Sequence, residues 1–182
     1  MSPSNRRRLV AGVGLAAAGL GLGWGLRRQL SRPPDDAADP TPAAPDLLWN
    51  ARFEAPDGGE IVMAAFRARP LVLNFWATWC APCIEEMPLL DRFEREHRGA
   101  GWQVVGLALD SAEPVREFLA RTPVGFAIGL ASARGVALSR SLGNTQGALP
   151  FSVAFAADGN PFAHKLGALK RQELTSWVDQ VR

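Results

Sequence analysis

The chain has 182 residues, of which 47% are hydrophobic and 21% charged, and it contains two cysteines. This length supports one domain with a buried core; the apolar fraction excludes disorder throughout, and two cysteines exclude a miniprotein stapled by many disulfides. Residues 1–46 carry six Arg and four Asp, while residues 47–182 carry 14 basic and 14 acidic residues and are formally neutral. A neutral domain lacks the basic surface that nucleic acid requires, so we expect no nucleic-acid partner.

The N-terminus reads as a targeting segment. An uncharged run, Leu9–Leu26, lies between a basic segment at residues 1–8 and Arg27-Arg28. As a helix it would be about 27 Å long, close to the roughly 30 Å core of a bilayer. We predict an uncleaved signal-anchor over residues 9–26. Two alternatives stay open, a signal peptide cleaved near Ala16–Ala18 and a twin-arginine signal at Arg6–Arg8; all three readings export the rest of the chain.

Residues 27–46 are rich in Pro, Ala and Asp, a composition that cannot form a core. We predict a linker there, followed by a folded domain over residues 47–182.

Strands and helices are expected to alternate in that domain. A first hairpin is predicted from strands at 48–55 and 61–66 around Asp57-Gly58-Gly59, and a second from strands at 151–156 and 162–166 around Asp158-Gly159-Asn160. Hydrophobic spacing predicts further strands at 71–76, 102–109 and 126–130, and helices at 81–97, 113–121, 134–142 and 171–181. The fold class is therefore α/β, with a mixed central sheet flanked by helices.

The chemistry is concentrated in Cys80-Ala81-Pro82-Cys83, at the junction of a predicted buried strand and a helix. Unpaired backbone N–H groups and the helix dipole stabilise a thiolate at Cys80 and lower its pKa. The spacing places Cys83 one helical turn further on, deeper and shielded, where it can resolve a mixed disulfide. We predict a redox-active Cys80–Cys83 disulfide.

Two structural interpretations of the pair are weaker. Zinc needs two more ligands, and only His97 and His164 remain as scattered candidates. A static disulfide across a two-residue loop stabilises little by loop closure. We expect neither a metal nor another cofactor.

Glu86 follows Cys83 by three residues, so the two side chains are neighbours on one helix face, whereas Glu85 points nearly the opposite way. A carboxyl tucked against the sulfurs would have a raised pKa and could shuttle the proton of the resolving thiol. The alternative is a solvated surface glutamate.

Residues 56–90, PDGGEIVMAAFRARPLVLNFWATWCAPCIEEMPLL, resemble the periplasm-facing thioredoxin-like proteins of the TlpA/ResA family, most densely in NFWATWCAPC. The resemblance implies a thioredoxin fold with a central insertion, here within residues 111–146. It implies a thiol–disulfide oxidoreductase, acting as a reductase of exported proteins from an anchor in a bacterial inner membrane. It further implies a membrane thiol reductant as electron donor, and substrates such as apocytochrome c or copper-site proteins.

The same resemblance implies roles for individual residues. Pro150 occupies the place of a cis-proline facing the cysteines, which would leave the backbone of Leu149 free to pair with a substrate strand. Trp79 is expected to wall the sulfurs and contact substrate. Asn74 stands where ordinary thioredoxins carry a buried acid, so the general-base role must move to Glu86 or water, or be absent.

Two other functions found on similar folds remain alternatives. A thiol peroxidase needs Pro-x-x-x-Thr-x-x-Cys, whereas Thr78 lies only two residues before Cys80. A copper carrier of this kind uses Cys-x-x-x-Cys and a distant His; this chain has one residue fewer between its cysteines, and His164 is expected on the surface. Disulfide reduction is the favoured reading, with these two as alternatives.

Overall fold

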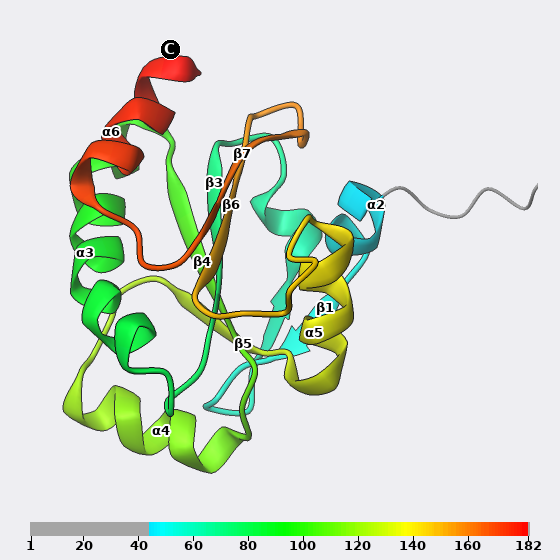
Figure 1. The fold of residues 1–182 in the computed structure, drawn as a ribbon, viewed down its shortest axis with the longest axis vertical. Helices are drawn as coiled ribbons and strands as arrows, with labels where there is room; N and C mark the ends of the chain where they lie inside the picture. Colours follow the sequence, from blue (N-terminus) through cyan, green and yellow to red (C-terminus); the bar gives the residue numbers. More distant parts are fainter. Residues whose placement is uncertain (1–43, 182) are drawn as a thin grey trace, which may run out of the picture. The chain divides into compact units, whose positions relative to one another are not determined.

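The computed structural model describes residues 44–181, which form a seven-stranded sheet with helices on both faces (Figure 1). The strand order is β2-β1-β5-β4-β3-β6-β7. Its strands are β1 (Arg52–Glu54), β2 (Glu60–Val62), β3 (Leu71–Trp76), β4 (Gln103–Ala108), β5 (Ala127–Leu130), β6 (Phe151–Phe155) and β7 (Pro161–Leu166). The α-helices are α2 (Ala44–Trp49), α3 (Ala81–His97), α4 (Ala112–Arg121), α5 (Ser132–Ser141) and α6 (Arg171–Gln180), and short 3₁₀ turns cover Met63–Phe66 and Arg98–Ala100.

The sheet is mixed, as predicted. Strands β3, β4 and β5 run parallel at its centre, while β6 and β7 form an antiparallel hairpin on one side and β1 and β2 another on the other side. A parallel centre with covered faces requires strands that are apolar throughout, and every residue of β3 and β4 is buried. The residues that end β3 therefore emerge from the middle of the sheet.

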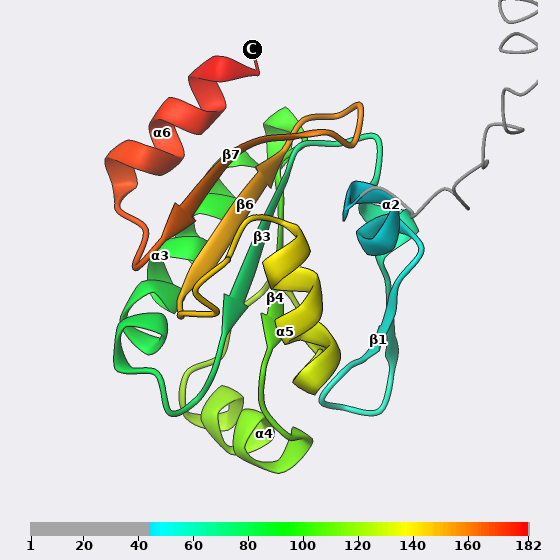
Figure 2. The ribbon, with the colours of Figure 1, turned by 45° about the vertical axis from the view of Figure 1, so that its right-hand side comes forward.

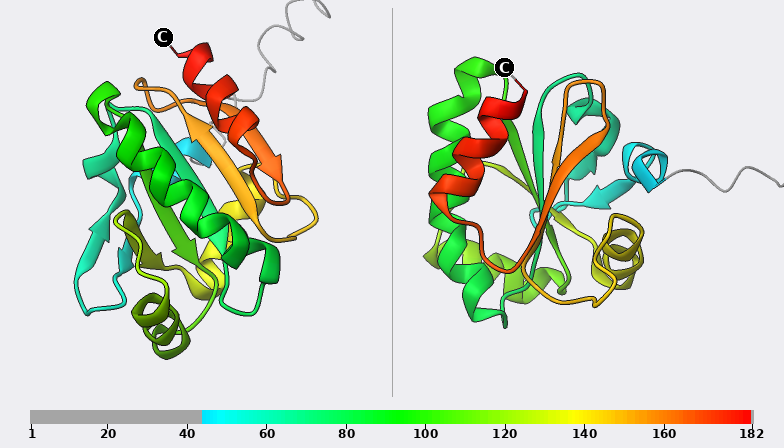
Figure 3. Two further views of the ribbon diagram at one scale, coloured as in Figure 1. Left: turned by 90° about the vertical axis from the view of Figure 1, so that its left-hand side faces the viewer. Right: turned by 45° about the horizontal axis from the view of Figure 1, so that its top comes forward.

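Side chains of β3 alternate between two cores, because successive residues of a strand point to opposite faces. Val72 and Trp76 pack with α3, α4 and α6, whereas Leu73 and Phe75 pack with α2 and α5. Figures 2 and 3 show α3 and α6 together on one face and α5 on the other. Asn74 shares the face of Val72 and Trp76, so the alternation places this polar side chain beneath α3.

The first predicted hairpin is present, but its strands are shorter than predicted. Leu48 and Trp49, expected at the start of a strand, instead end α2, where both are buried; β1 covers only three residues. The second predicted strand, 61–66, turns into a 3₁₀ helix at Met63. Short apolar runs fit a buried helical turn as well as a strand, and burial against the second core decides between them.

Between β4 and β6, the region predicted to hold the central insertion contains α4, β5 and α5. Strand β5 pairs in parallel with β4 and extends the sheet toward β1, which it meets through the pair Glu54 and Leu130. The insertion is confirmed, and the predicted boundaries of these elements differ from the observed ones by one or two residues.

The targeting predictions fall almost entirely outside the described residues: the basic segment 1–8, the signal-anchor 9–26 and most of the linker 27–46. The last three residues of that linker, 44–46, form the first turn of α2. None of the helices within 44–181 has the length and apolar character needed to cross a bilayer.

Candidate active site

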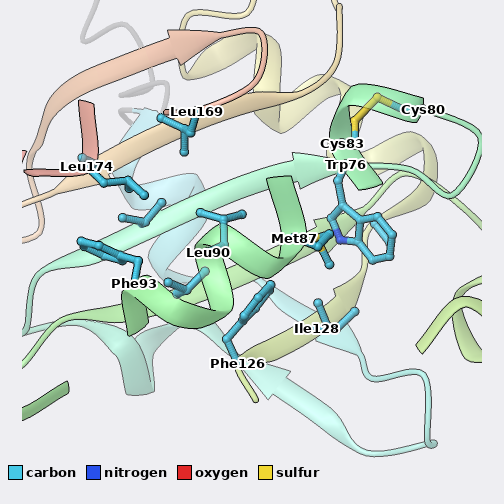
Figure 4. Packing of buried hydrophobic residues seen from close by; sticks show 14 of the residues in the cluster. Trp76, Cys80, Cys83, Met87, Leu90, Phe93, Phe126, Ile128, Leu169 and Leu174 are labelled. Carbon is cyan, nitrogen blue, oxygen red and sulfur yellow. A yellow bond between two sulfur atoms is a disulfide. The ribbon is translucent and has the colours of Figure 1, made fainter. Parts of the chain in front are cut away.

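Cys80 and Cys83 lie where β3 gives way to α3, on the face that α3 covers. Cys80 is the N-cap residue, and its carbonyl accepts hydrogen bonds from the N–H groups of Cys83 (3.0 Å) and Ile84 (3.1 Å). The two sulfurs form a disulfide of 2.02 Å with the Cα atoms 5.3 Å apart. Figure 4 shows the disulfide at the end of the core cluster that contains Trp76 and Met87.

The two sulfur-bearing residues differ in access to solvent. Cys80 retains 7% of its surface exposed, and Cys83 is completely buried. The predicted order, an outer first cysteine and a shielded second one, is confirmed, although Cys80 is less open than expected of an attacking residue. A partner can therefore approach the pair only from the side of Cys80.

The loop that delivers Cys80 is tied to the neighbouring strand. Thr78 donates from its backbone N–H (3.2 Å) and its hydroxyl (2.5 Å) to Asp110 Oδ2, just beyond β4. Trp79, between this anchor and the cysteine, is 71% exposed. Most of the Trp79 side chain is therefore open to solvent, next to the cysteine pair in the chain.

Glu86 is buried and hydrogen-bonded, so the surface-glutamate alternative is excluded. It is 3% exposed, whereas Glu85 is exposed. Its Oε1 accepts from Asn74 Nδ2 at 2.8 Å, and its Oε2 accepts from the backbone N–H of Leu169 at 2.7 Å. Asn74 Nδ2 also donates to Ser152 Oγ at 2.9 Å, across the strand pair β3–β6. The carboxyl thus accepts from two donors, Asn74 on β3 and the N–H of Leu169 just before α6, and Asn74 is bound in turn to Ser152 on β6.

The environment of Glu86 brings the pKa of its carboxyl close to neutral pH. Burial raises the pKa of Glu86 from 4.5 to about 7, although the hydrogen bonds from Leu169 and Asn74 oppose the rise; the negative charge of Glu173 adds to it. A carboxyl with this pKa is half ionised near pH 7, so it can both take up and release a proton there. Glu86 lies on the same face of α3 as Cys83, three residues further along.

Pro150 lies at the same end of the central strands as the cysteines. The Leu149–Pro150 peptide bond is cis, as predicted, and Pro150 directly precedes β6. In the β3–β6 ladder Phe75 pairs with Phe151, so Pro150 stands beside the end of β3, from which the cysteine loop departs. Leu149 is half-buried and packs against both cores.

Histidines contribute little to this region. His164 is exposed on β7, as predicted, and His97 at the end of α3 hydrogen-bonds through Nδ1 with the carbonyl of Phe93 at 3.0 Å. Within residues 44–181, no three His, Cys, Asp or Glu side chains are grouped so that they could hold a metal ion.

Sequence reasoning found the cysteines, Glu86 and Pro150. The cysteines and Pro150 lie at the carboxyl end of β3, and Glu86 is bound to Asn74 within that strand. The same reasoning missed Ser152 and the N–H of Leu169 as partners of the buried polar cluster, because both arrive from the distant C-terminal part of the chain. Asp110 could have been found, since an acid directly after a parallel strand lies at the edge where the neighbouring strand also ends.

Comparisons with known proteins agree with this geometry. A family model described as Redoxin matches residues 38–178. The thiol-disulfide oxidoreductase ResA of Oceanobacillus iheyensis is 36% identical over 73 residues, which cover 40% of this chain and 38% of that protein. The ResA of Bacillus cereus is 24% identical over 126 residues, covering 69% of this chain and 70% of the relative.

Solved structures share the fold. A thioredoxin-related protein from Neisseria meningitidis serogroup B is 31% identical, with a TM-score of 0.61, over 69% of this chain and 93% of that chain. The DsbF protein of MTB, solved in mixed oxidized and reduced forms, is 26% identical, with a TM-score of 0.63, over 78% of this chain and 98% of that chain. With the Redoxin model matching well over half of its length, the chain belongs to the redoxin family and is a TlpA/ResA-like thiol–disulfide oxidoreductase of thioredoxin-like fold.

Proposed function

We propose that the protein reduces disulfides of exported proteins, with Cys80 as the attacking residue and Cys83 as the resolving one. The observation that carries this assignment is the difference in solvent access between the two cysteines. Cys80, the N-cap residue of α3, is partly exposed, and Cys83 is completely buried. Positioning at a helix N-terminus stabilises the Cys80 thiolate and makes it nucleophilic near neutral pH.

The exchange proceeds in two steps. The Cys80 thiolate of the reduced protein attacks one sulfur of the substrate disulfide, forming a mixed disulfide and releasing the first substrate thiolate. The Cys83 thiolate then attacks the Cys80 sulfur, which releases the second substrate thiolate and leaves Cys80–Cys83 oxidised. Two electrons pass to the substrate. A dithiol donor, which we propose is a membrane thiol reductant, restores the reduced pair.

Glu86 is the proton acceptor for Cys83 in this scheme. The second step needs a thiolate at a residue without access to water, and a carboxyl with a pKa of about 7 on the same helix face can take its proton. An ionised Glu86 also disfavours thiolates nearby by like-charge repulsion. A stabilised thiolate makes a cysteine pair more oxidising, so a destabilised thiolate makes the pair more reducing.

The substrate is proposed to dock across Trp79 and the loop at Leu149–Pro150, which flank Cys80. The signal-anchor at residues 9–26 and the linker after it would hold the domain on the periplasmic side of a bacterial inner membrane. Apocytochrome c and copper-site proteins, whose cysteines must be reduced before they bind their cofactors, are the proposed substrate classes.

Trapping of mixed disulfides tests the proposal. In the full chain, Cys83→Ser is expected to accumulate a mixed disulfide through Cys80, whereas Cys80→Ser is expected to trap nothing and to lose reductase activity. Mass spectrometry of the trapped partners identifies the substrates. Equal residual activity in both variants, or turnover of hydrogen peroxide without reduction of any disulfide, would contradict the assignment.

A further inference from the structure

The loop between α5 and β6 leads directly to Pro150, and one buried side chain organises it. Asn144 is 2% exposed. Its Nδ2 donates to the carbonyl of Ala148 at 2.9 Å, and its Oδ1 accepts from the N–H of Ala148 at 3.1 Å. A single side-chain amide therefore satisfies both backbone polar groups of the residue two positions before Pro150.

The backbone of Asn144 is itself fixed by the end of α5. Gly143 has a positive φ of 110°; its N–H bonds to the carbonyl of Arg140 (3.1 Å), and the N–H of Asn144 bonds to that of Ser139 (3.0 Å). This pair of bonds is the Schellman motif that ends many helices. The carbonyl of Asn144 also accepts from the N–H of Gly147 at 3.0 Å. Asn144 thus connects the helix end to the loop through both its backbone and its side chain.

The residues on either side of Leu149 are anchored. Ala148 is held by Asn144, and the carbonyl of Pro150 accepts from the N–H of Gly167 at 2.8 Å. In the described part of the chain, no hydrogen bond engages the N–H or the carbonyl of Leu149. One residue with unused backbone groups therefore stands between two fixed ones, beside the end of β3.

We propose that Asn144 is a positioning residue for substrate binding. By holding Ala148, it presents the backbone of Leu149 in a fixed orientation to an extended segment of the substrate next to its disulfide. This inference rests on the proposed function. Main-chain pairing of this kind recognises any extended polypeptide, so the substrate class is a disulfide within a chain that can align beside Leu149, rather than a small disulfide.

Pre-organisation explains why the effect should depend on the substrate. A loop already held in its binding conformation loses little entropy when a partner pairs with it. Without the Asn144 amide, Ala148 loses both partners, and the adjacent Leu149 backbone is no longer fixed. A small disulfide, which has no backbone to pair, does not use this benefit.

The test compares two substrates with the full chain, a peptide carrying its disulfide within an extended segment, and hydroxyethyl disulfide. For Asn144→Ala, the ratio of kcat/KM for the peptide to kcat/KM for hydroxyethyl disulfide is expected to fall about tenfold, mainly through KM. Asn144→Asp keeps the acceptor for the Ala148 N–H but replaces the donor with a second acceptor facing the Ala148 carbonyl, so its ratio is also expected to fall. Hydrogen exchange at the Ala148 amide should accelerate in Asn144→Ala and remain slower in Asn144→Asp.

Asn160→Ala is the matched control, because Asn160 is exposed in the turn at the opposite end of the β6–β7 hairpin; its ratio should equal that of the wild type. An unchanged ratio in both Asn144 variants, or an equal loss with both substrates, overturns the inference. If Asn144→Ala does not fold, Asn144→Asp decides by the same ratio. If the wild type reduced neither the peptide nor hydroxyethyl disulfide, the proposed function itself would instead be overturned.

Discussion

Asn74 donates a hydrogen bond of 2.8 Å to Glu86, and this bond joins the central strand β3 to the helix that starts at the cysteines. Both side chains are buried, and each is bound to a further element: Glu86 to the N–H of Leu169, and Asn74 to Ser152. Asn74 supplies two N–H donors at a position where an acid would supply none at neutral pH. The arrangement keeps one carboxyl, rather than two, between β3 and α3.

The raised pKa of Glu86 predicts that the folded protein loses stability as the pH rises. The protonated form is favoured in the folded state, with a pKa of about 7, relative to 4.5 for the ordinary carboxyl. The folded state therefore binds more protons between these values, and its stabilisation, complete below pH 4.5, disappears as the pH passes 7. The loss is about 3 kcal/mol, because one pKa unit corresponds to about 1.4 kcal/mol. Denaturant unfolding of the oxidised full chain at several pH values measures it.

Glu86→Gln should remove this dependence, since the amide does not titrate. Glu85→Gln is the control, because Glu85 is exposed on the same turn of α3 and should leave the pH profile as in the wild type. A wild-type unfolding free energy that is flat between pH 4.5 and 7 would show that Glu86 is not the buried acid described here.

A second prediction concerns Asn74→Asp. The substitution removes both N–H donors and places a second carboxyl against Glu86, so we expect the pKa of Glu86 to rise further. An NMR titration of the Glu86 carboxyl measures the change. The pH at which the mixed disulfide is resolved half-maximally should move upward in parallel.

Ser152→Ala provides the comparison for Asn74→Asp. It removes a different partner of Asn74 and leaves the bond between Asn74 and Glu86 in place, so the titration of Glu86 should move less. Identical titrations in the wild type and Asn74→Asp would mean that Asn74 does not control the proton affinity of Glu86.

Local pattern was sufficient to predict much of this site. The strand–helix junction placed Cys80 and Cys83, and three-residue spacing on a helix put Glu86 on the face of Cys83; both depend on contacts within one turn. Alternation along β3 also places Asn74 on the side of Val72 and Trp76. What local pattern cannot supply is the partner that arrives from a distant segment. The N–H of Leu169 lies 83 residues from Glu86 in the chain, and only the assembled sheet brings it there.

The errors in the first predicted hairpin have a similar cause. Leu48 and Trp49 are apolar and adjacent to a genuine strand, so pattern alone extends the strand through them, whereas packing on the second core makes them helical. The role of Asn144 could not be predicted from the sequence for another reason. A Gly-Asn pair after a helix predicts a helix end, but not that the side chain turns back to hold the loop before Pro150.

Trp79→Ala should separate substrate binding from stability. Because the side chain is 71% exposed, its removal is expected to change the free energy of unfolding by less than about 0.5 kcal/mol. Exposed tryptophans beside a reactive group are frequent binding hot spots, so KM for a protein disulfide should rise severalfold. Leu47→Ala, an exposed apolar residue on α2 across the sheet, serves as the control and should leave KM as it is. An unaltered KM in Trp79→Ala would remove Trp79 from the substrate surface.

Gly106→Ala tests the packing under the site. Gly106 pairs with Asn74 in the β3–β4 ladder, and a Cβ there would lie 2.8 Å from Ile128 Cδ1 and 3.1 Å from Trp76 Nε1. Overpacking in a close-packed core costs about 1–3 kcal/mol, so the free energy of unfolding should fall by that amount. A displaced Trp76 would also shift the start of the loop that carries the cysteines, and alkylation of reduced Cys80 should change in rate.

Gly99→Ala is the matched control for Gly106→Ala, because a Cβ at Gly99 meets no atom within 4 Å. Its unfolding free energy should stay within about 0.5 kcal/mol of the wild type, as for other surface substitutions. Equal stability of the two variants would show that the β4 backbone can move away from Trp76. In that case Trp76 would keep its place, and the alkylation rate of reduced Cys80 in Gly106→Ala should equal that of the wild type.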